Sequence, residues 1–129
     1  MQNSILLDTH ILIWLMYSPD SLNPEIKQTI NDSSEVFVSI ASFWEMAIKH
    51  KNGKLAYNPK EIMDNLGMAN ISILQIQPSH IDKYKTIQLP QSDPFDCMIV
   101  SQSVAENMIL VTADKVLINS KYKTVEVNN

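Results

Sequence analysis

Short apolar runs alternate with amphipathic segments along the whole chain. Continuous apolar runs are typical of parallel strands covered on both faces, whereas apolar residues at three- and four-residue steps indicate helices. The expected strands are residues 4–7, 35–38, 71–76, 108–111 and 124–127. The expected helices are residues 11–16, 24–31, 41–51, 59–68, 78–87, 94–107 and 114–119. This alternation predicts an α/β fold with a parallel sheet of about five strands and helices on both faces.

Residues 90–114 form a complete helix-to-strand unit. Asp93 before Pro94 is a strong helix start, because aspartate accepts hydrogen bonds as an N-cap and proline fits the first helical position. Asn107 is expected to end this helix, since asparagine tolerates the left-handed conformation. The mostly apolar face of the helix is expected to comprise Phe95, Met98, Ile99, Gln102 and Ala105.

Four acids fall near the carboxyl end of an expected strand or early in the helix that follows it. They are Asp8, Glu45, Asp96 and Asp114. In open α/β sheets, ligand sites form at this edge of the sheet. Asp8 directly follows the first strand, where it has no obvious capping role, and is therefore a candidate for chemistry.

The other acids also have structural explanations. Asp93 and Asp114 can cap helices, Asp96 can interact with a helix dipole, and Glu45 can be a surface residue. Around Glu45, the apolar residues Phe43, Trp44, Ala47 and Ile48 are expected to pack in the core. The case for chemistry therefore depends on the acids meeting in one place.

Length and composition favour one compact domain over residues 1–129. No apolar run reaches the roughly 18 residues needed to cross a bilayer, and no signal peptide is evident. The single cysteine, Cys97, suits a reducing environment and predicts a cytoplasmic protein. The net charge of −4 argues against general nucleic-acid binding, but a metal can invert the field of one acidic pocket.

A cluster of four carboxylates favours bound cations, because two carboxylates about 5 Å apart repel by roughly 3 kcal/mol at an effective dielectric near 20. Oxygen ligands predict Mg²⁺, with Mn²⁺ as a substitute, and scattered histidines argue against zinc. The matching chemistry is phosphodiester hydrolysis by metal-activated water. Shortly after Glu45 in the sequence comes a basic segment made of Lys49, Lys51 and Lys54. These lysines either form a solvated helix end or contact the phosphates of a nucleic acid.

The order and spacing of four motifs resemble those of PIN-domain ribonucleases, in particular the VapC toxins of toxin–antitoxin pairs. The motifs are LLDTH at 6–10, SIASFWEMAIKHKNGKL at 39–55, SDPFD at 92–96 and LVTAD at 110–114. The resemblance implies strand order 3-2-1-4-5 and an Mg²⁺-dependent endoribonuclease inhibited by a cognate antitoxin. It also implies homodimers, which could pair with antitoxin as a dimer of heterodimers.

The same resemblance makes Asp8, Glu45, Asp96 and Asp114 the metal-binding catalytic acids, with Asp93, Thr112 and Thr9 as further candidates. Two positions depart from the usual pattern: Gln91 replaces a histidine and Cys97 replaces an arginine. Neither change removes a metal ligand. Both affect residues expected to contact phosphate, and therefore affect which RNA the protein would select.

Other classes of protein fit less well. A phosphoacceptor receiver domain would need an acidic pair after the first strand and an aspartate after the third, where Thr9-His10 and Gln77-Pro78 stand instead. An aspartate-nucleophile phosphatase would need a second aspartate in place of His10. A PIN domain that only binds remains an alternative, which metal titration distinguishes. Catalysis by Cys97 lacks an evident histidine partner.

Overall fold

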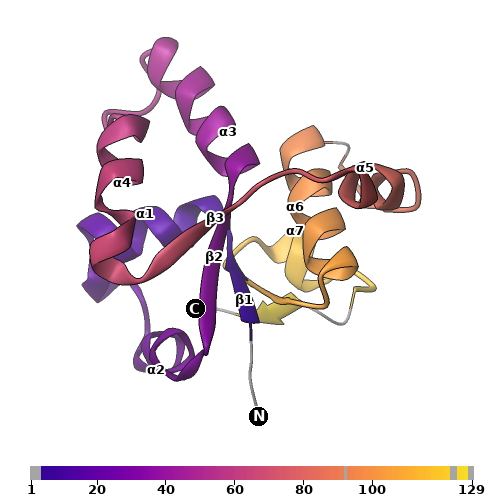
Figure 1. The fold of residues 1–129 in the computed structure, drawn as a ribbon, viewed down its shortest axis with the longest axis horizontal. Helices are drawn as coiled ribbons and strands as arrows, with labels where there is room; N and C mark the ends of the chain where they lie inside the picture. Colours follow the sequence, from indigo (N-terminus) through magenta and orange to yellow (C-terminus); the bar gives the residue numbers. More distant parts are fainter. Residues whose placement is uncertain (1–3, 92, 123–124, 128–129) are drawn as a thin grey trace.

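A single five-stranded sheet organises the molecule (Figure 1). The computed structural model describes residues 4–91, 93–122 and 125–127. All paired strands run parallel, and their order is β3-β2-β1-β4-β5. The strands are β1 (Ser4–Leu7), β2 (Glu35–Ser39), β3 (Ile71–Leu74), β4 (Ile109–Thr112) and β5 (Val125–Val127). The predicted α/β class and strand order are confirmed; Thr124, the expected start of the last strand, lies outside the described residues.

Every helix expected from the sequence is present, with shifted ends. The α-helices are α1 (Thr9–Tyr17), α2 (Pro24–Asp32), α3 (Ile40–Lys51), α4 (Pro59–Asn65), α5 (Pro78–Tyr84), α6 (Pro94–Ala105) and α7 (Lys115–Ile118). A 3₁₀ turn at Pro19–Ser21 lies between α1 and α2, and another at Leu66–Ala69 lies between α4 and β3. Of the helices in the described ranges, none is long and apolar enough to cross a membrane.

The two faces of the sheet carry two hydrophobic cores. In β1, Ile5 and Leu7 belong to one core and Leu6 to the other, as the alternation of side chains along a strand requires. The first core also takes buried residues from α1, α2, α3 and α4, and the second takes them from α6 and α7. Figure 1 shows these two helical layers on opposite sides of the sheet, with α5 against α6. Helices on both faces are thus confirmed.

Local signals placed several helix ends correctly. Asp93 caps α6, and its Oδ1 accepts hydrogen bonds from the backbone N–H of Phe95 at 2.8 Å and of Asp96 at 3.2 Å. Asn107 takes the left-handed conformation after α6, with φ of 55°. Gly53 does the same after α3, with φ of 73°. The geometry at both ends of α6 follows from these residues alone.

The expected core face of α3 is largely wrong. Phe43 is buried, but Trp44 is 61% exposed and Ile48 is 40% exposed, and Ala47 is also exposed. Met46 fills the core position on this part of the helix. Both Met46 and Trp44 are apolar, so periodicity alone could not tell which of the two faces the sheet.

In α6 the buried surface is wider than the expected face. Ile99 and Gln102 are buried as expected, whereas Phe95, Met98 and Ala105 are half-buried. Burial extends to Cys97, Val100, Ser101 and Ser103, because α6 lies between the sheet and α5.

Candidate active site

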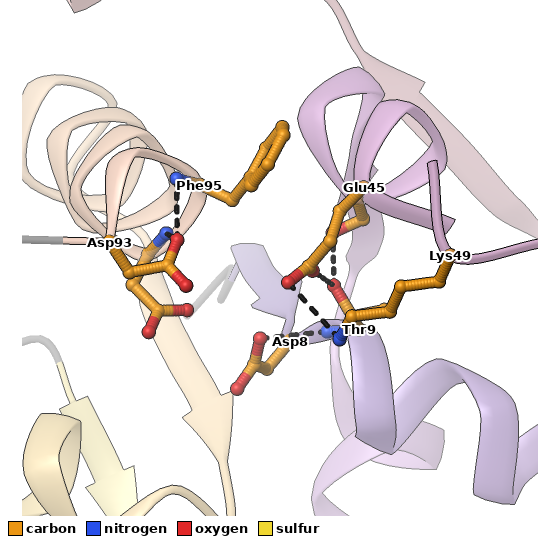
Figure 2. A network of polar contacts seen from close by, with 8 residues as sticks. Asp8, Thr9, Glu45, Lys49, Asp93 and Phe95 are labelled. Carbon is orange, nitrogen blue, oxygen red and sulfur yellow. Dashed lines mark hydrogen bonds and ion pairs between the residues drawn. The ribbon is translucent and has the colours of Figure 1, made fainter. Parts of the chain in front are cut away.

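All four acids expected at strand ends line one cleft of about 220 Å³. Asp93 lines it too, from the N-cap of α6. Asp8 directly follows β1, Asp114 lies two residues after β4, and Glu45 and Asp96 lie on α3 and α6, so distant parts of the chain meet at the carboxyl edge of the sheet. Figure 2 shows Asp8 at the base of the site, with Glu45 on α3 and Asp93 on α6 to either side.

Asp8 is the most deeply buried of these acids, with 6% of its surface exposed. It caps α1: its Oδ1 accepts a hydrogen bond from the backbone N–H of Thr9 at 2.8 Å. Its Oδ2 accepts one from the hydroxyl of Thr112 at 2.5 Å. Burial raises the pKa of the Asp8 carboxyl, although both hydrogen bonds act in the opposite direction. The expectation that Asp8 has no capping role is therefore wrong, because α1 begins directly after β1.

Thr112, a further candidate in the sequence, links two of the acids. Its hydroxyl donates to Asp8 and accepts a hydrogen bond from the backbone N–H of Asp114 at 3.0 Å. Asp114 in turn caps α7, its Oδ1 accepting from the backbone N–H of Val116 at 2.9 Å. The caps formed by Asp93 and Asp114 use only Oδ1 of each carboxylate, so a structural and a chemical role are compatible at both.

Glu45 is held from two sides. The Thr9 hydroxyl oxygen lies 3.2 Å from its Oε1 and 2.9 Å from the hydroxyl oxygen of buried Ser42. Because a carboxylate only accepts, the Thr9 hydroxyl donates its proton to Glu45, and the Ser42 hydroxyl can donate to the Thr9 oxygen. The Lys49 ammonium lies 3.4 Å from the Glu45 Oε2, one helical turn further on (Figure 2). The contact between Ser42 and Thr9 depends on how α1 packs on α3.

Asp96 carries the clearest electrostatic signature of the cluster. Its pKa rises from 3.8 to about 7, first through burial and then through repulsion from Asp8, Asp93, Asp114 and Glu45. Carboxylates that raise one another's pKa share a small volume of low dielectric. The acids therefore form one electrostatic unit that favours either a proton or a metal cation.

This pKa predicts how the stability of the metal-free protein depends on pH. The folded protein holds a proton on Asp96 that the unfolded chain has released, so stability falls as pH rises from about 4 to 7 and then levels off. At 1.36 kcal/mol per pKa unit the full effect is about 4 kcal/mol, which partial solvent exposure reduces to on the order of 2 kcal/mol. Urea unfolding in EDTA should show this fall in wild type and a shallower one in Asp96→Asn. Parallel pH curves for the two proteins would contradict the prediction.

The basic segment divides in the structure. Lys49 lines the cleft, whereas Lys51 and Lys54 are exposed and do not contribute to its wall. Three further residues line the cleft: Thr9, a candidate in the sequence, His10, which was not singled out there, and Gln91, which had been noted as a departure from the family pattern. The signal for His10 was its place two residues after Asp8.

The donor set suits a hard divalent cation. The cleft offers carboxylate and hydroxyl oxygens, and burial together with repulsion from the neighbouring acids raises the pKa of Asp96, an environment whose negative charge a cation would neutralise. In the described part of the chain, no three His, Cys, Asp or Glu side chains converge as ligands of one ion. Rotation of these side chains would bring the carboxylates closer together once a cation offsets their mutual repulsion.

Comparison with known proteins identifies the class that this fold and cleft define. The sequence profile of the PIN domain family matches residues 5–121. The chain therefore belongs to the PIN domain family, whose members are nucleases. No curated protein matches the sequence closely.

Solved toxin–antitoxin complexes contain chains of the same fold. A chain of VapBC2 from Rickettsia felis, solved with a DNA fragment from the promoter, has a TM-score of 0.70 at 17% identity, and the match covers 98% of this chain and 99% of that one. DNA-bound VapBC from Salmonella typhimurium gives 0.71 at 14% identity, with 98% of each chain covered. A toxin–antitoxin complex from Klebsiella pneumoniae gives 0.65 at 19% identity, covering 95% and 96%. At these identities the likeness concerns the fold.

Proposed function

We propose that this protein is an Mg²⁺-dependent endoribonuclease and the toxin of a toxin–antitoxin pair. The observation that carries the proposal is the single cleft in which Asp8, Glu45, Asp96 and Asp114 meet and repel one another. Membership of a nuclease family and the shared fold of VapBC complexes support it. Mn²⁺ should substitute, since it accepts the same oxygen ligands.

The residues of the cleft have separable roles in this proposal. Asp8 and Asp96 hold the metal at the base of the cleft, with Glu45 and Asp114 completing the acidic wall. Thr9 and Thr112 orient Glu45 and Asp8 through their hydroxyl groups. Asp93 keeps α6 in place as its N-cap and adds negative charge. When bound, Mg²⁺ would activate water for attack on the phosphodiester and neutralise the charge that develops on the phosphate.

The test of this function is an endonuclease assay on matched substrates. Purified protein with Mg²⁺ should cut structured RNA internally and leave the DNA of the same sequence intact. The identity of the RNA, whether transfer, ribosomal or messenger, is then found by sequencing the new ends. Equal cleavage of RNA and DNA would restrict the assignment to a nuclease, and metal binding without cleavage of either would favour a binding module.

Among the three lysines, we propose that Lys49 alone contacts RNA phosphate at the site. Lys49→Ala should lower the slope of log affinity against log salt by roughly 0.7, the value for one lost contact to single-stranded nucleic acid. Lys54→Ala is the matched control, because Lys54 is exposed and lies outside the cleft wall. Filter binding over a range of salt concentrations measures both slopes. Equal slopes for Lys49→Ala and wild type would show that Lys49 does not contact RNA phosphate and only pairs with Glu45.

The partners proposed for this chain are a cognate antitoxin and a second copy of itself, in the cytoplasm. The solved VapBC complexes support an antitoxin partner. A small protein encoded beside this gene should bind the chain and inhibit cleavage, in a dimer of heterodimers whose mass light scattering can measure. An adjacent gene product that neither binds nor inhibits would count against the toxin assignment while leaving the nuclease in place.

A further inference from the structure

A second pocket opens from the acidic cleft on the side of α1. It has a volume of about 290 Å³, and its wall is made by Asp8, His10, Trp14, Ala113 and Asp114. Three of these residues, Asp8, His10 and Asp114, also line the cleft. The pocket and the cleft are therefore continuous, and a group that enters the pocket lies beside the acids.

Two rings on successive turns of α1 set the character of this pocket. Trp14 is half-buried: it packs against the first hydrophobic core and also lines the pocket. His10, four residues earlier, is exposed, and its ring centre lies 6.2 Å from that of Trp14 with the planes at 48°. Core packing fixes the indole, whereas the imidazole stands where the pocket joins the cleft. The pocket thus combines an aromatic wall with two carboxylates.

The charge of the wall limits what can occupy the pocket. Asp8 and Asp114 repel a phosphate, and among the residues that the structure describes no lysine lines the pocket. A phosphate is better placed in the cleft, where Lys49 and a bound cation would offset the acids. A nucleobase is flat and neutral, and its N–H groups can donate to a carboxylate. The pocket therefore suits a base, and the adjoining cleft suits the phosphate.

We propose that His10 and Trp14 form a subsite for an unpaired base of the RNA, on a nucleotide next to the phosphate that is cleaved. This inference rests on the proposed nuclease function. Aromatic side chains, histidine included, bind the bases of single-stranded RNA by stacking. The base stacks on the exposed imidazole of His10 and reaches the indole of Trp14 deeper in the pocket. His10 is then a residue that binds substrate and selects it, beside the acids that carry the chemistry.

Two substitutions of His10 separate a stacked base from a contact to phosphate. His10→Phe keeps a ring without charge, His10→Asn keeps a polar group without a ring, and neither disturbs the core because His10 is exposed. His10→Asn should weaken binding of a non-cleavable 2′-O-methyl RNA decamer by about 5- to 30-fold, the equivalent of about 1 to 2 kcal/mol for stacking on a small ring. His10→Phe should retain most of the wild-type affinity. A fully abasic decamer, which keeps the sugars and phosphates, should bind all three proteins equally in Mg²⁺.

Removal of single bases locates the subsite along the RNA. In a set of decamers with one abasic nucleotide each, one position next to the cleaved phosphate should matter: loss of its base weakens binding to wild type and His10→Phe but not to His10→Asn. The fluorescent base 2-aminopurine at that position should be quenched by the first two proteins and less by the third. His50→Asn is the matched control, because His50 is an exposed histidine on α3 that lines neither the pocket nor the cleft. It should keep the wild-type dependence on that base.

The outcomes separate this inference from the nuclease assignment. If wild type cleaves RNA and His10→Asn binds the decamer as tightly as wild type, the base subsite is wrong and the nuclease stands. Base-dependent binding that His10→Asn loses, without cleavage by wild type, would support the subsite and overturn the nuclease. Equal losses in His10→Phe and His10→Asn, on the RNA and abasic decamers alike, would show a phosphate contact and refute the subsite. The proposal also fails if His10→Asn keeps its RNA affinity but escapes inhibition by the protein encoded beside this gene, because the pocket then receives the antitoxin.

Discussion

Asp8→Asn is expected to reduce RNA cleavage by about 100- to 10,000-fold. Asparagine keeps the shape of the side chain and can still accept the hydrogen bond from the Thr9 N–H, but it removes the charge from the base of the cleft. A metal contributes several kcal/mol of transition-state stabilisation, and each 1.4 kcal/mol is a factor of ten in rate. Single-turnover cleavage at saturating Mg²⁺ measures the loss.

The stability of the same variant separates a catalytic defect from a folding defect. Removing the charge abolishes the cost of burying it and its repulsion of the other acids, which should raise the free energy of unfolding by on the order of 1 kcal/mol. It also weakens the hydrogen bond from Thr112, which should lower the free energy of unfolding by a similar amount. Thermal unfolding without metal should therefore differ from wild type by less than about 1 kcal/mol. Asp8→Asn with wild-type cleavage and lowered stability would show that Asp8 is only a helix cap.

Asp93→Asn is the matched control for Asp8→Asn. Both residues cap helices through Oδ1, and asparagine caps about as well as aspartate. Because the proposed metal ligands at the base of the cleft are Asp8 and Asp96, whereas Asp93 only adds negative charge, replacement of Asp93 should cost less than about tenfold in rate, far below the loss at Asp8. Equal losses at the two positions would make Asp93 a full member of the metal site.

Removal of divalent metal is expected to stop cleavage altogether. In EDTA the rate should fall by at least about 1,000-fold, since the acids alone bring no positive charge to the phosphate. Excess Mg²⁺ or Mn²⁺ should restore it. Full activity in EDTA would refute the mechanism.

Metal binding should also appear as stability in the absence of RNA. At one hundred times its dissociation constant, Mg²⁺ should raise the free energy of unfolding of wild type by about 2.7 kcal/mol. The gain should be smaller in Asp8→Asn and in Asp96→Asn, because each has lost a charged oxygen ligand. Equal stabilisation of all three proteins would place the metal elsewhere.

Local sequence signals were the most reliable predictors of structure. Asp93 before Pro94 predicted the start of α6, and Asn107 predicted the left-handed residue after it. These features depend on neighbours within one turn. The convergence of the four acids was also predictable, because the carboxyl ends of parallel strands meet at one edge of the sheet. The strand order itself came from the family resemblance.

Features that depend on packing between distant segments could not be predicted. The cap at Asp8 was missed because nothing in the sequence shows that β1 passes into α1 without a loop. Trp44 was expected in the core but is exposed. Apolar residues lie on more than one side of α3, so the sequence does not show which side faces the sheet. The contact between Thr9 and Ser42 requires α1 to lie against α3.

The most direct test of the acidic cleft as a metal centre is an anomalous difference map from crystals grown with Mn²⁺. The account predicts a peak in the cleft, ligated by Asp8 and Asp96, that disappears in Asp8→Asn. A map without a peak there, at a Mn²⁺ concentration that supports RNA cleavage, would contradict it.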